Sequence, residues 1–358
     1  MNATGAFALG AFCAVMVGAA PAAKPVAQGG MPVRVHVFED YETRIEARWW
    51  LRGTPVATNL PPSLSASLPN TRACLAAPSK DFDDKMGNAT AQYRAVVFNP
   101  VPGPPMGPRT RLSFRYWLKG TSTLRVQIYS LTRNYHRRLT LENLPQLRWQ
   151  EATVDMTQAR RPDGSGGPLS EDERIDDIQF YISPEAELMI DDIVLYEAAA
   201  ENETGPFPRH MGFTGWFDTG QQGAEWPGHF DIVLHEKPRT WDAAQSVAHP
   251  KDGLPWIRLN LRGERALAAD NELFFRYHLA ADARLTVHLV NSKTGREHGV
   301  RIANTAVGAW DDVTIPYPVP RGLLPDRVDE IHLRLDRKGK LLIDDLLLYE
   351  PGKASGPP

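Results

Sequence analysis

Residues 188–197, Leu-Met-Ile-Asp-Asp-Ile-Val-Leu-Tyr-Glu, return near the end of the chain at 341–350 as Leu-Leu-Ile-Asp-Asp-Leu-Leu-Leu-Tyr-Glu. Earlier segments repeat as well, since residues 112–118 align with 273–279 and residues 175–178 align with 328–331. Trp149 and Trp310 also occupy equivalent places. Matches spread over this many segments indicate two homologous modules in tandem.

The repeated segments alternate apolar and polar residues with a period of two, which is typical of strands with one buried face. In residues 111–118, the apolar side chains that share one face are Leu112, Phe114, Tyr116 and Leu118. Leu124, Val126 and Ile128 alternate in the same way with polar neighbours. A shift of one residue would bury the arginines, so the faces are strongly specified. The sequence therefore predicts an all-β protein of two tandem antiparallel β-sandwich domains.

The composition limits the class of protein. The chain has 358 residues, and 40 basic against 43 acidic residues give a net charge of -3. That balance excludes a strongly basic nucleic-acid binder, and the length suits about two domains. The 30 prolines and 28 glycines favour strands and turns over long helices.

The N-terminal segment before Lys24, the first charged side chain, is rich in alanine and glycine. Ala20 and Ala22 form an A-x-A cleavage pattern, which favours a signal peptide at 1–22 over the alternative of an uncleaved membrane anchor. We then expect module one at 31–199, a linker at 200–208, module two at 209–350 and a flexible tail at 351–358. The expected location is secreted, periplasmic or at the cell surface, with membrane contact only if the leader is retained. After cleavage Cys74 would be the single cysteine, so no intramolecular disulfide is expected.

Each module resembles the jelly-roll, galactose-binding-like sandwiches that serve as carbohydrate-binding modules of secreted bacterial polysaccharide-degrading proteins. The resemblance rests on the opening residues Phe38-Glu39-Asp40 and on the two closing Ile-Asp-Asp strands. It implies that the chain binds a polysaccharide or glycan. Members of this family often carry a structural calcium ion where the first and last strands meet.

Four carboxylates match the places of such calcium ligands. They are Glu39 and Asp191 in module one, and Asp344 with Asp218 in module two. Calcium takes several oxygen ligands, among them one or more carboxylates. The alternative is that these acids are solvated charges at strand ends or cap local turns.

A sugar-binding face combines aromatic rings, which stack on the apolar faces of sugars, with polar groups for the hydroxyls. The outward positions of the central strands supply this mixture: Arg115, Trp117, Gln127 and Tyr129 in module one, and Arg276, His278 and His288 in module two. Because Trp117 has His278 as its counterpart, the sequence predicts the stronger site in module one. The alternative is that one outward face packs on the partner module. Further tryptophans could also serve as platforms, although sandwiches also bury tryptophan: Trp49, Trp50, Trp149, Trp241, Trp256 and Trp310. For Trp149 and Trp310, packing in the core or at the start of a strand is the favoured interpretation.

Catalysis and a purely structural role are the competing functions. A glycosidase needs two carboxylates across a cleft, whereas consecutive Asp residues on a strand point to opposite faces. No catalytic serine, phosphate-loop or dinucleotide motif is present. We therefore expect an exported, non-catalytic polysaccharide-binding protein, with a polysaccharide lyase or hydrolase, or an adhesion protein, as alternatives. The sequence leaves the oligomeric state open.

Overall fold

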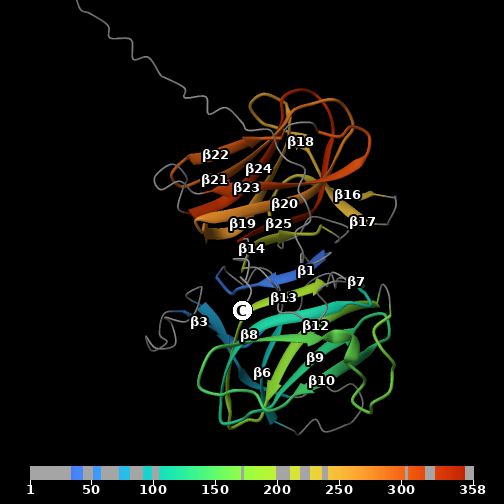
Figure 1. The fold of residues 1–358 in the computed structure, drawn as a ribbon, viewed down its shortest axis with the longest axis vertical. Helices are drawn as coiled ribbons and strands as arrows, with labels where there is room; N and C mark the ends of the chain where they lie inside the picture. Colours follow the sequence, from blue (N-terminus) through green and yellow to red (C-terminus); the bar gives the residue numbers. More distant parts are fainter. Residues whose placement is uncertain are drawn as a thin grey trace, which may run out of the picture.

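The computed structural model describes residues 34–42, 51–57, 72–80, 92–98, 105–170, 173–198, 210–217, 226–235, 241–302, 305–318 and 327–350. Over these ranges the chain forms antiparallel strands and a single turn of 3-10 helix, Met156–Gln158. No helix in this part of the chain is long and apolar enough to cross a membrane. The predicted all-β fold of two antiparallel sandwiches is confirmed (Figure 1).

Module one consists of two sheets. We name them the interface sheet, which faces module two, and the outer sheet. The interface sheet has the order β11-β8-β13-β4-β3, with β1 paired to β13: β1 (Arg34–Glu39), β3 (Thr54–Ala57), β4 (Arg72–Leu75), β8 (Thr110–Lys119), β11 (Gln150–Asp155) and β13 (Glu187–Glu197). The outer sheet has the order β10-β9-β12-β6-β2, with β5 on β6 and β7 on β12: β2 (Leu51–Arg52), β5 (Ala77–Lys80), β6 (Gln92–Phe98), β7 (Pro105–Met106), β9 (Leu124–Ser130), β10 (Tyr135–Leu141) and β12 (Glu173–Ile182).

Module two repeats this plan. Its interface sheet has the order β16-β17-β25-β20-β23, with β14 paired to β25: β14 (His210–Gly215), β16 (Asp231–His235), β17 (Trp241–Gln245), β20 (Asp270–Leu279), β23 (Trp310–Pro318) and β25 (Leu341–Glu350). Its outer sheet has the order β15-β19-β24-β21-β22, with β18 on β19: β15 (Gly228–His229), β18 (Val247–Ala248), β19 (Pro255–Ala266), β21 (Leu285–Asn291), β22 (Arg296–Arg301) and β24 (Arg327–Leu335).

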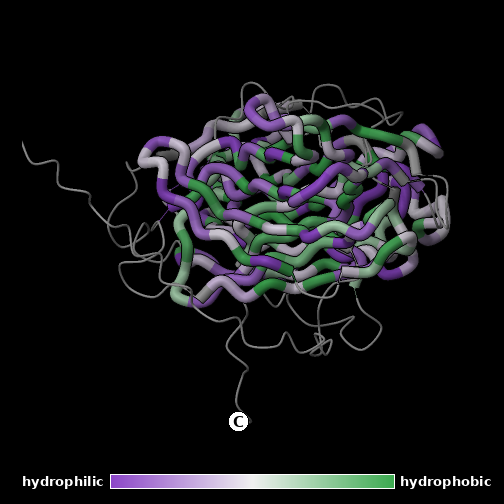
Figure 2. Tube along the Cα trace, turned by 90° about the horizontal axis from the view of Figure 1, so that it is seen from above, coloured by the Kyte–Doolittle hydropathy of each residue, from purple (hydrophilic) through white to green (hydrophobic). Residues whose placement is uncertain are grey.

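Each module has its own apolar core between its two sheets. In module one the core includes the four apolar residues predicted for β8, from Leu112 to Leu118, together with Leu124, Val126 and Ile128 of β9. Hydrophobic and hydrophilic residues alternate along many strands, as Figure 2 shows from the module two end. The period-two pattern therefore assigned the buried faces correctly.

A third apolar cluster joins the two modules. Val35, Phe38, Val194 and Tyr196 of module one pack in it with Met211, Leu347 and Tyr349 of module two. Beside it, Arg265 of β19 donates a hydrogen bond to the Asp40 carboxylate, and both side chains are buried. Strands β1 and β14 thus lie against each other in the middle of the molecule (Figure 1). The alternative of an outward face that packs on the partner module is correct for both interface sheets.

Candidate functional site

Arg115 and Trp117 lie on β8, on the face of the interface sheet that points away from the core of module one. Trp117 is only 7% exposed, because it packs in a cluster with Ala73, Trp149 and Met189. Arg115 holds its guanidinium 5.6 Å from the centroid of the Trp149 ring. The expectation of an exposed Trp117 platform is therefore wrong, since the buried ring cannot offer its face to a sugar.

The same arrangement recurs in module two around Arg276. Its guanidinium lies 5.6 Å from the centroid of the Trp310 ring, and His278 lies 5.9 Å from that ring. Arg276 is 3.4 Å from Asp345, just as Arg115 is 3.8 Å from Asp192. The two aspartates have left-handed backbone angles, with φ values of 46° for Asp192 and 48° for Asp345. Such a conformation is uncommon for a residue other than glycine, so each arginine anchors a strained bulge of the closing strand.

Gln127 and Tyr129 lie on β9 in the outer sheet, on the side of module one opposite to Arg115. Gln127 is fully buried and donates a hydrogen bond of 2.9 Å to the Gln179 side chain. Tyr129 donates its hydroxyl hydrogen to Asn134 and packs against His136 at 4.9 Å between ring centroids. The structure therefore divides the four residues predicted for module one between two faces, so they cannot form a single site.

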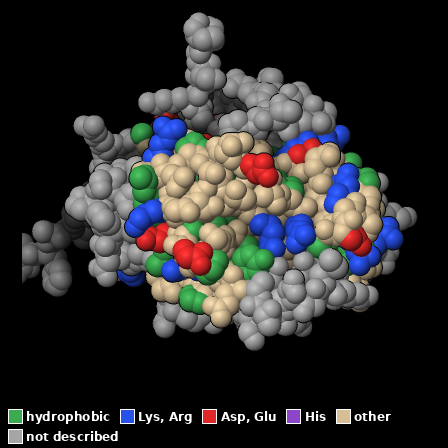
Figure 3. Space-filling view, turned by 90° about the horizontal axis from the view of Figure 1, so that it is seen from below, with side chains coloured by type: hydrophobic (Ala, Val, Ile, Leu, Met, Phe, Trp, Pro, Cys, Tyr) green, Lys and Arg blue, Asp and Glu red, His purple; other side chains and the backbone are tan. Residues whose placement is uncertain are grey.

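Side chains of module one fill much of its own outer face. The Arg125 guanidinium lies between two rings, 4.7 Å from Tyr93 and 4.5 Å from Tyr181. Seen from this end of the molecule, basic and acidic side chains of the described residues are interspersed (Figure 3). On this face, Arg125 thus packs against tyrosine rings of its own module.

The outer sheet of module two differs, because His288 lies there beside a pocket. Strand pairing brings one row of residues across this sheet: His229, Arg258, His332, His288 and Gly299. Gly299 leaves room for the His288 ring, since a Cβ there would lie 2.7 Å from Cε1 of His288 and the ring would have to move. Trp256, Arg334 and Thr286 form the neighbouring row.

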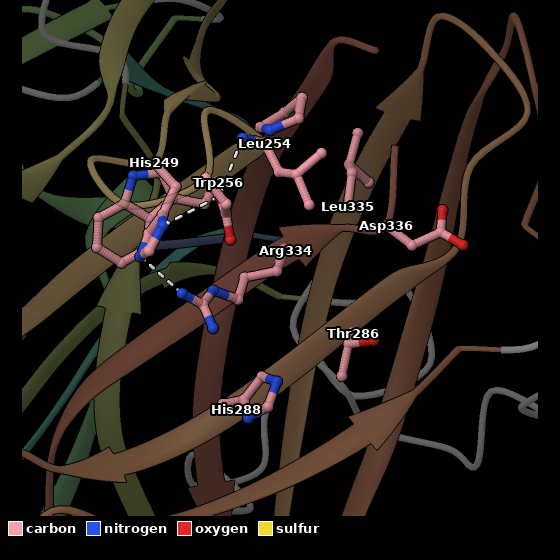
Figure 4. Close-up of a pocket in the computed structure, with 10 residues that line it drawn as sticks. His249, Leu254, Trp256, Thr286, His288, Arg334, Leu335 and Asp336 are labelled. Atoms are coloured by element: carbon pink, nitrogen blue, oxygen red, sulfur yellow. Dashed lines mark hydrogen bonds and ion pairs between the residues drawn. The ribbon is translucent and has the colours of Figure 1, made fainter. Parts of the chain in front are cut away.

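The pocket has a volume of about 200 Å³. The side chains that line it and carry polar or aromatic groups are His249, Asp252, Trp256, Thr286, His288, Arg334 and Asp336 (Figure 4). They come from strands β19, β21 and β24, from the turn before β19 and, in the case of Asp336, from the position directly after β24. A pocket below about 300 Å³ is smaller than the usual site for a drug-sized ligand, so it suits one sugar-sized ring.

Trp256 is the centre of the pocket's aromatic wall. Its ring lies 4.4 Å from His249 and 5.3 Å from His332, edge to face in both cases. Arg334 donates a hydrogen bond of 2.6 Å to Nε2 of His249, whose Nδ1 is 3.1 Å from Asp252. Because arginine can only donate, Nε2 of His249 accepts this hydrogen bond, and the two contacts hold the His249 ring in place.

Burial and hydrogen bonds shift the pKa values of several side chains in this region. Burial lowers the pKa of His288 and of His332, which favours the neutral rings at pH 7. Burial alone would raise the pKa of Glu330, but hydrogen bonds from Arg258 and His332 outweigh it and hold that pKa below its usual value. In this row His288 and His332 are therefore neutral, and Arg258 forms an ion pair with Glu330 beside it.

The predicted calcium ligands of module one, Glu39 and Asp191, are both buried where the first and last strands meet. Glu39 accepts a hydrogen bond of 2.7 Å from the backbone N–H of Tyr41. Both carboxylate oxygens of Asp191 are buried without a hydrogen-bond partner. Burial, and then the charge of Asp192, raise the pKa of Asp191 well above its usual value. Buried oxygens of this kind fit a hard cation, although the described residues contain no group of three or more metal-type side chains.

Module two keeps only part of this arrangement. Asp344 is buried and accepts a hydrogen bond of 2.7 Å from the backbone N–H of Asp345. The place of Glu39 is occupied by Gly215, where a Cβ would lie 2.8 Å from the Phe217 ring. Asp218, the other predicted ligand, lies outside the described residues. Phe217 thus fills the space that a second carboxylate would need.

The pocket residues Arg334 and His249 were not identified from the sequence, and Trp256 was considered only as one of several tryptophans. A signal was present, because residues 256–261 and 330–335 both alternate polar and apolar side chains. The polar positions of these two runs face each other across the β19–β24 pairing, with Trp256 opposite Arg334. The alternation gives the outward residues of each strand, but the pocket depends on this register.

Comparison with known proteins finds similarity in structure only. No family model and no curated protein matches the chain. Among solved structures, the chain is similar to the N-terminal CBM22-1-CBM22-2 tandem domain of Paenibacillus barcinonensis Xyn10C, with 11% identity, a TM-score of 0.31, and coverage of 89% of this chain and 98% of that one. It is also similar to the family 11 carbohydrate-binding module of Clostridium thermocellum in complex with a β-1,3-1,4-mixed-linked tetrasaccharide, with 16% identity, a TM-score of 0.30, and coverage of 46% and 94%. A third similar structure is TmCBM61 in complex with β-1,4-galactotriose, with 17% identity, a TM-score of 0.28, and coverage of 38% and 94%. Since every TM-score is below 0.5, the functional proposal below rests on the site and not on these likenesses.

Proposed function

We propose that this protein is an exported, non-catalytic polysaccharide-binding protein and that the pocket on the outer sheet of module two is its binding site. One observation carries the proposal: an aromatic wall, Trp256, meets Arg334, His288 and Thr286 in a hollow of about 200 Å³. Apolar walls with a few convergent polar groups are typical of ligand sites. This combination suits a sugar ring, which has apolar faces and a rim of hydroxyls.

The carboxylates of the pocket support binding without hydrolysis. A hydrogen bond from the backbone N–H of Leu254 lowers the pKa of Asp252, and one from Arg284 lowers the pKa of Asp336. Both groups are therefore ionised at neutral pH. A glycosidase needs one carboxylic acid with a raised pKa that protonates the leaving oxygen, and neither of these two residues fits that role.

A blocking substitution tests the site. Thr286 lies on the outward side of β21, so Thr286→Trp fills the pocket without entering the core. Thr294→Trp places the same ring on an exposed turn and serves as the matched control. In pull-down assays with insoluble polysaccharides, we expect the wild type and Thr294→Trp to bind and Thr286→Trp to lose binding.

Two results would contradict the proposal. Equal binding by Thr286→Trp and the wild type would place the site elsewhere, and a wild type that binds no polysaccharide would refute the function. Release of soluble sugars from a bound polysaccharide would show that the protein is an enzyme.

We also propose that Glu39 and Asp191 bind a structural calcium ion. The unpartnered buried oxygens of Asp191 support this, since an ion there would satisfy groups that otherwise cost stability. Such an ion would tie β1 to β13, the strand pair next to the contact between the modules. Export is supported by the leader pattern of residues 1–22, which lie outside the described residues, and N-terminal sequencing of the secreted protein would test it.

A further inference from the structure

Arg334 is the arginine that lines the module two pocket. The structure gives its guanidinium one hydrogen bond, to the neutral Nε2 atom of His249. No carboxylate of the described residues forms an ion pair with it. A guanidinium has five N–H donors and does not lose its charge in proteins, so most of its binding capacity is unused here.

Two of the neighbouring carboxylates, Glu330 and Asp336, have cationic partners of their own. Arg258 forms an ion pair with Glu330, and Glu330 is also 2.8 Å from His332. Asp252 lies 3.1 Å from His249. Asp336 accepts a hydrogen bond of 2.9 Å from the backbone N–H of Arg284 and lies 3.4 Å from the Arg337 side chain. The charge of Asp252 also interacts with that of Arg334. Among the described residues, however, no carboxylate forms an ion pair with the Arg334 guanidinium, so its N–H donors can still bind an incoming anion.

The position of Arg334 is suited to holding an anion in place. It lies on the central strand β24, half-buried, with its guanidinium carbon 5.7 Å from the centroid of the Trp256 ring. The Trp256 ring and the bond to His249 restrict the guanidinium to a few orientations. A planar fork of donors held in this way recognises carboxylate or sulfate oxygens in pairs.

We propose, on the basis of the glycan binding proposed above, that the pocket selects acidic sugars and that Arg334 binds the carboxylate or sulfate group of one sugar ring. The remaining groups of the pocket suit the hydroxyls of that ring. The neutral His288 ring can donate or accept a hydrogen bond, while the Asp252 and Asp336 carboxylates accept hydrogen bonds at the rim. A free inorganic anion would leave these acceptors and the Trp256 wall without a ligand group to contact.

The test compares polymers that share a backbone and differ in charge. Polygalacturonate is compared with its fully methyl-esterified form, and dextran sulfate with dextran, each by isothermal titration of the full chain. We expect the charged member of a pair to bind at least tenfold more tightly, a difference of about 1.4 kcal/mol. Its affinity should fall as salt is raised, because ions screen the contact.

Substitution of Arg334 then tests whether this residue contacts the charged group of the polymer. Arg334→Gln should remove the preference for the charged polymer and leave binding to the neutral one. Arg327→Gln is the matched control: this exposed arginine begins the same strand seven residues earlier, ~23 Å away at ~3.3 Å per residue. Arg334→Lys keeps the charge but loses the fork, so it should retain only part of the preference. Unchanged melting temperatures would confirm that all three variants fold.

The outcomes separate this inference from the proposed function. Equal binding of charged and neutral polymers would overturn the selection of acidic sugars while polysaccharide binding stands. Binding of polygalacturonate by Arg334→Gln at the wild-type level would also overturn it. If neither the charged nor the neutral polymers bind, nor any polysaccharide in the pull-down assays, the proposed function itself fails.

Discussion

We expect the buried ion pair between Asp40 and Arg265 to hold the two modules together, so that they unfold as one unit. The Arg265 side chain is 4% exposed and the Asp40 side chain 6%, and the pair lies beside the apolar cluster that joins the modules. Arg265 also outweighs the effect of burial and holds the pKa of Asp40 below its usual value. Both groups are therefore charged at neutral pH and each depends on the other.

Removal of one partner leaves the other as an uncompensated buried charge. Such a change costs about 3–5 kcal/mol, whereas replacement of both partners by uncharged residues of similar size is often close to neutral. We therefore expect Arg265→Met to lower the free energy of unfolding by about 3–5 kcal/mol. Asp40→Asn should act in the same direction, and the double variant should lose clearly less than the sum of the two.

Urea denaturation, followed by far-UV circular dichroism and by tryptophan fluorescence, measures these effects on the full chain. The wild type should unfold in one transition by both probes, and the single variants should separate the transitions of the two modules. Single variants that cost less than about 1 kcal/mol would show that the pair behaves like a solvated surface contact. Strictly additive effects in the double variant would show that the two residues are not coupled.

Three further predictions address other parts of the molecule. Trp117→Ala should lower the free energy of unfolding in urea by about 3–5 kcal/mol, because the ring is buried; a fully stable variant would contradict that burial. Saturating calcium should raise the melting temperature of the wild type but not that of Asp191→Ala, and a wild type that responds to neither calcium nor chelator would refute the ion site. Burial lowers the pKa of His288 and His332, so below about pH 6.5 only the unfolded chain binds these protons and stability falls as pH falls. Thermal scans from pH 7 to 5 should therefore show a steeper loss for the wild type than for the double variant His288→Gln/His332→Gln, and equal slopes would contradict this assignment.

The strands and their buried faces could be predicted because alternation is a local property of the chain. The residues that alternate with Leu124, Val126 and Ile128 point away from the core, as the pattern required. Alternation does not say which sheet a strand joins, and β8 and β9 belong to opposite sheets of module one. Arg115 and Gln127 therefore lie on different faces of module one, although both occupy outward positions of strands that are consecutive in the sequence.

Whether an outward face of a sheet is exposed or buried depends on contacts with other segments, and the sequence of one strand does not predict those contacts. Trp117 is outward on β8, yet it is buried among Trp149, Met189 and Ala73, which belong to other strands or to the segment before β11. Trp256 and Arg334 are far apart in the sequence and meet only through the register of β19 and β24. Binding residues of this kind are set by strand pairing, so the sequence of each strand alone could not identify the pocket.

The two modules differ at equivalent positions, and these differences favour different roles. Strand register and the repeat place Arg125 and Tyr181 of module one where module two has Thr286 and Arg334. In module one the arginine lies against tyrosine rings and fills the outer face, whereas in module two the smaller threonine leaves a hollow that Arg334 lines.

The reverse exchange occurs where the first strand meets the last. Glu39, Tyr41 and Cys74 surround Asp191 in module one, and the equivalent residues of module two are Gly215, Phe217 and Ala244. Tyr41 and Phe217 share a left-handed backbone, with φ values of 55° and 53°, so the two modules have the same backbone geometry here and differ in their polar groups. A buried polar centre beside the contact between the modules favours a structural role for module one. An open pocket at the far end of module two favours ligand binding there. The ion pair between Asp40 and Arg265 holds the two modules together.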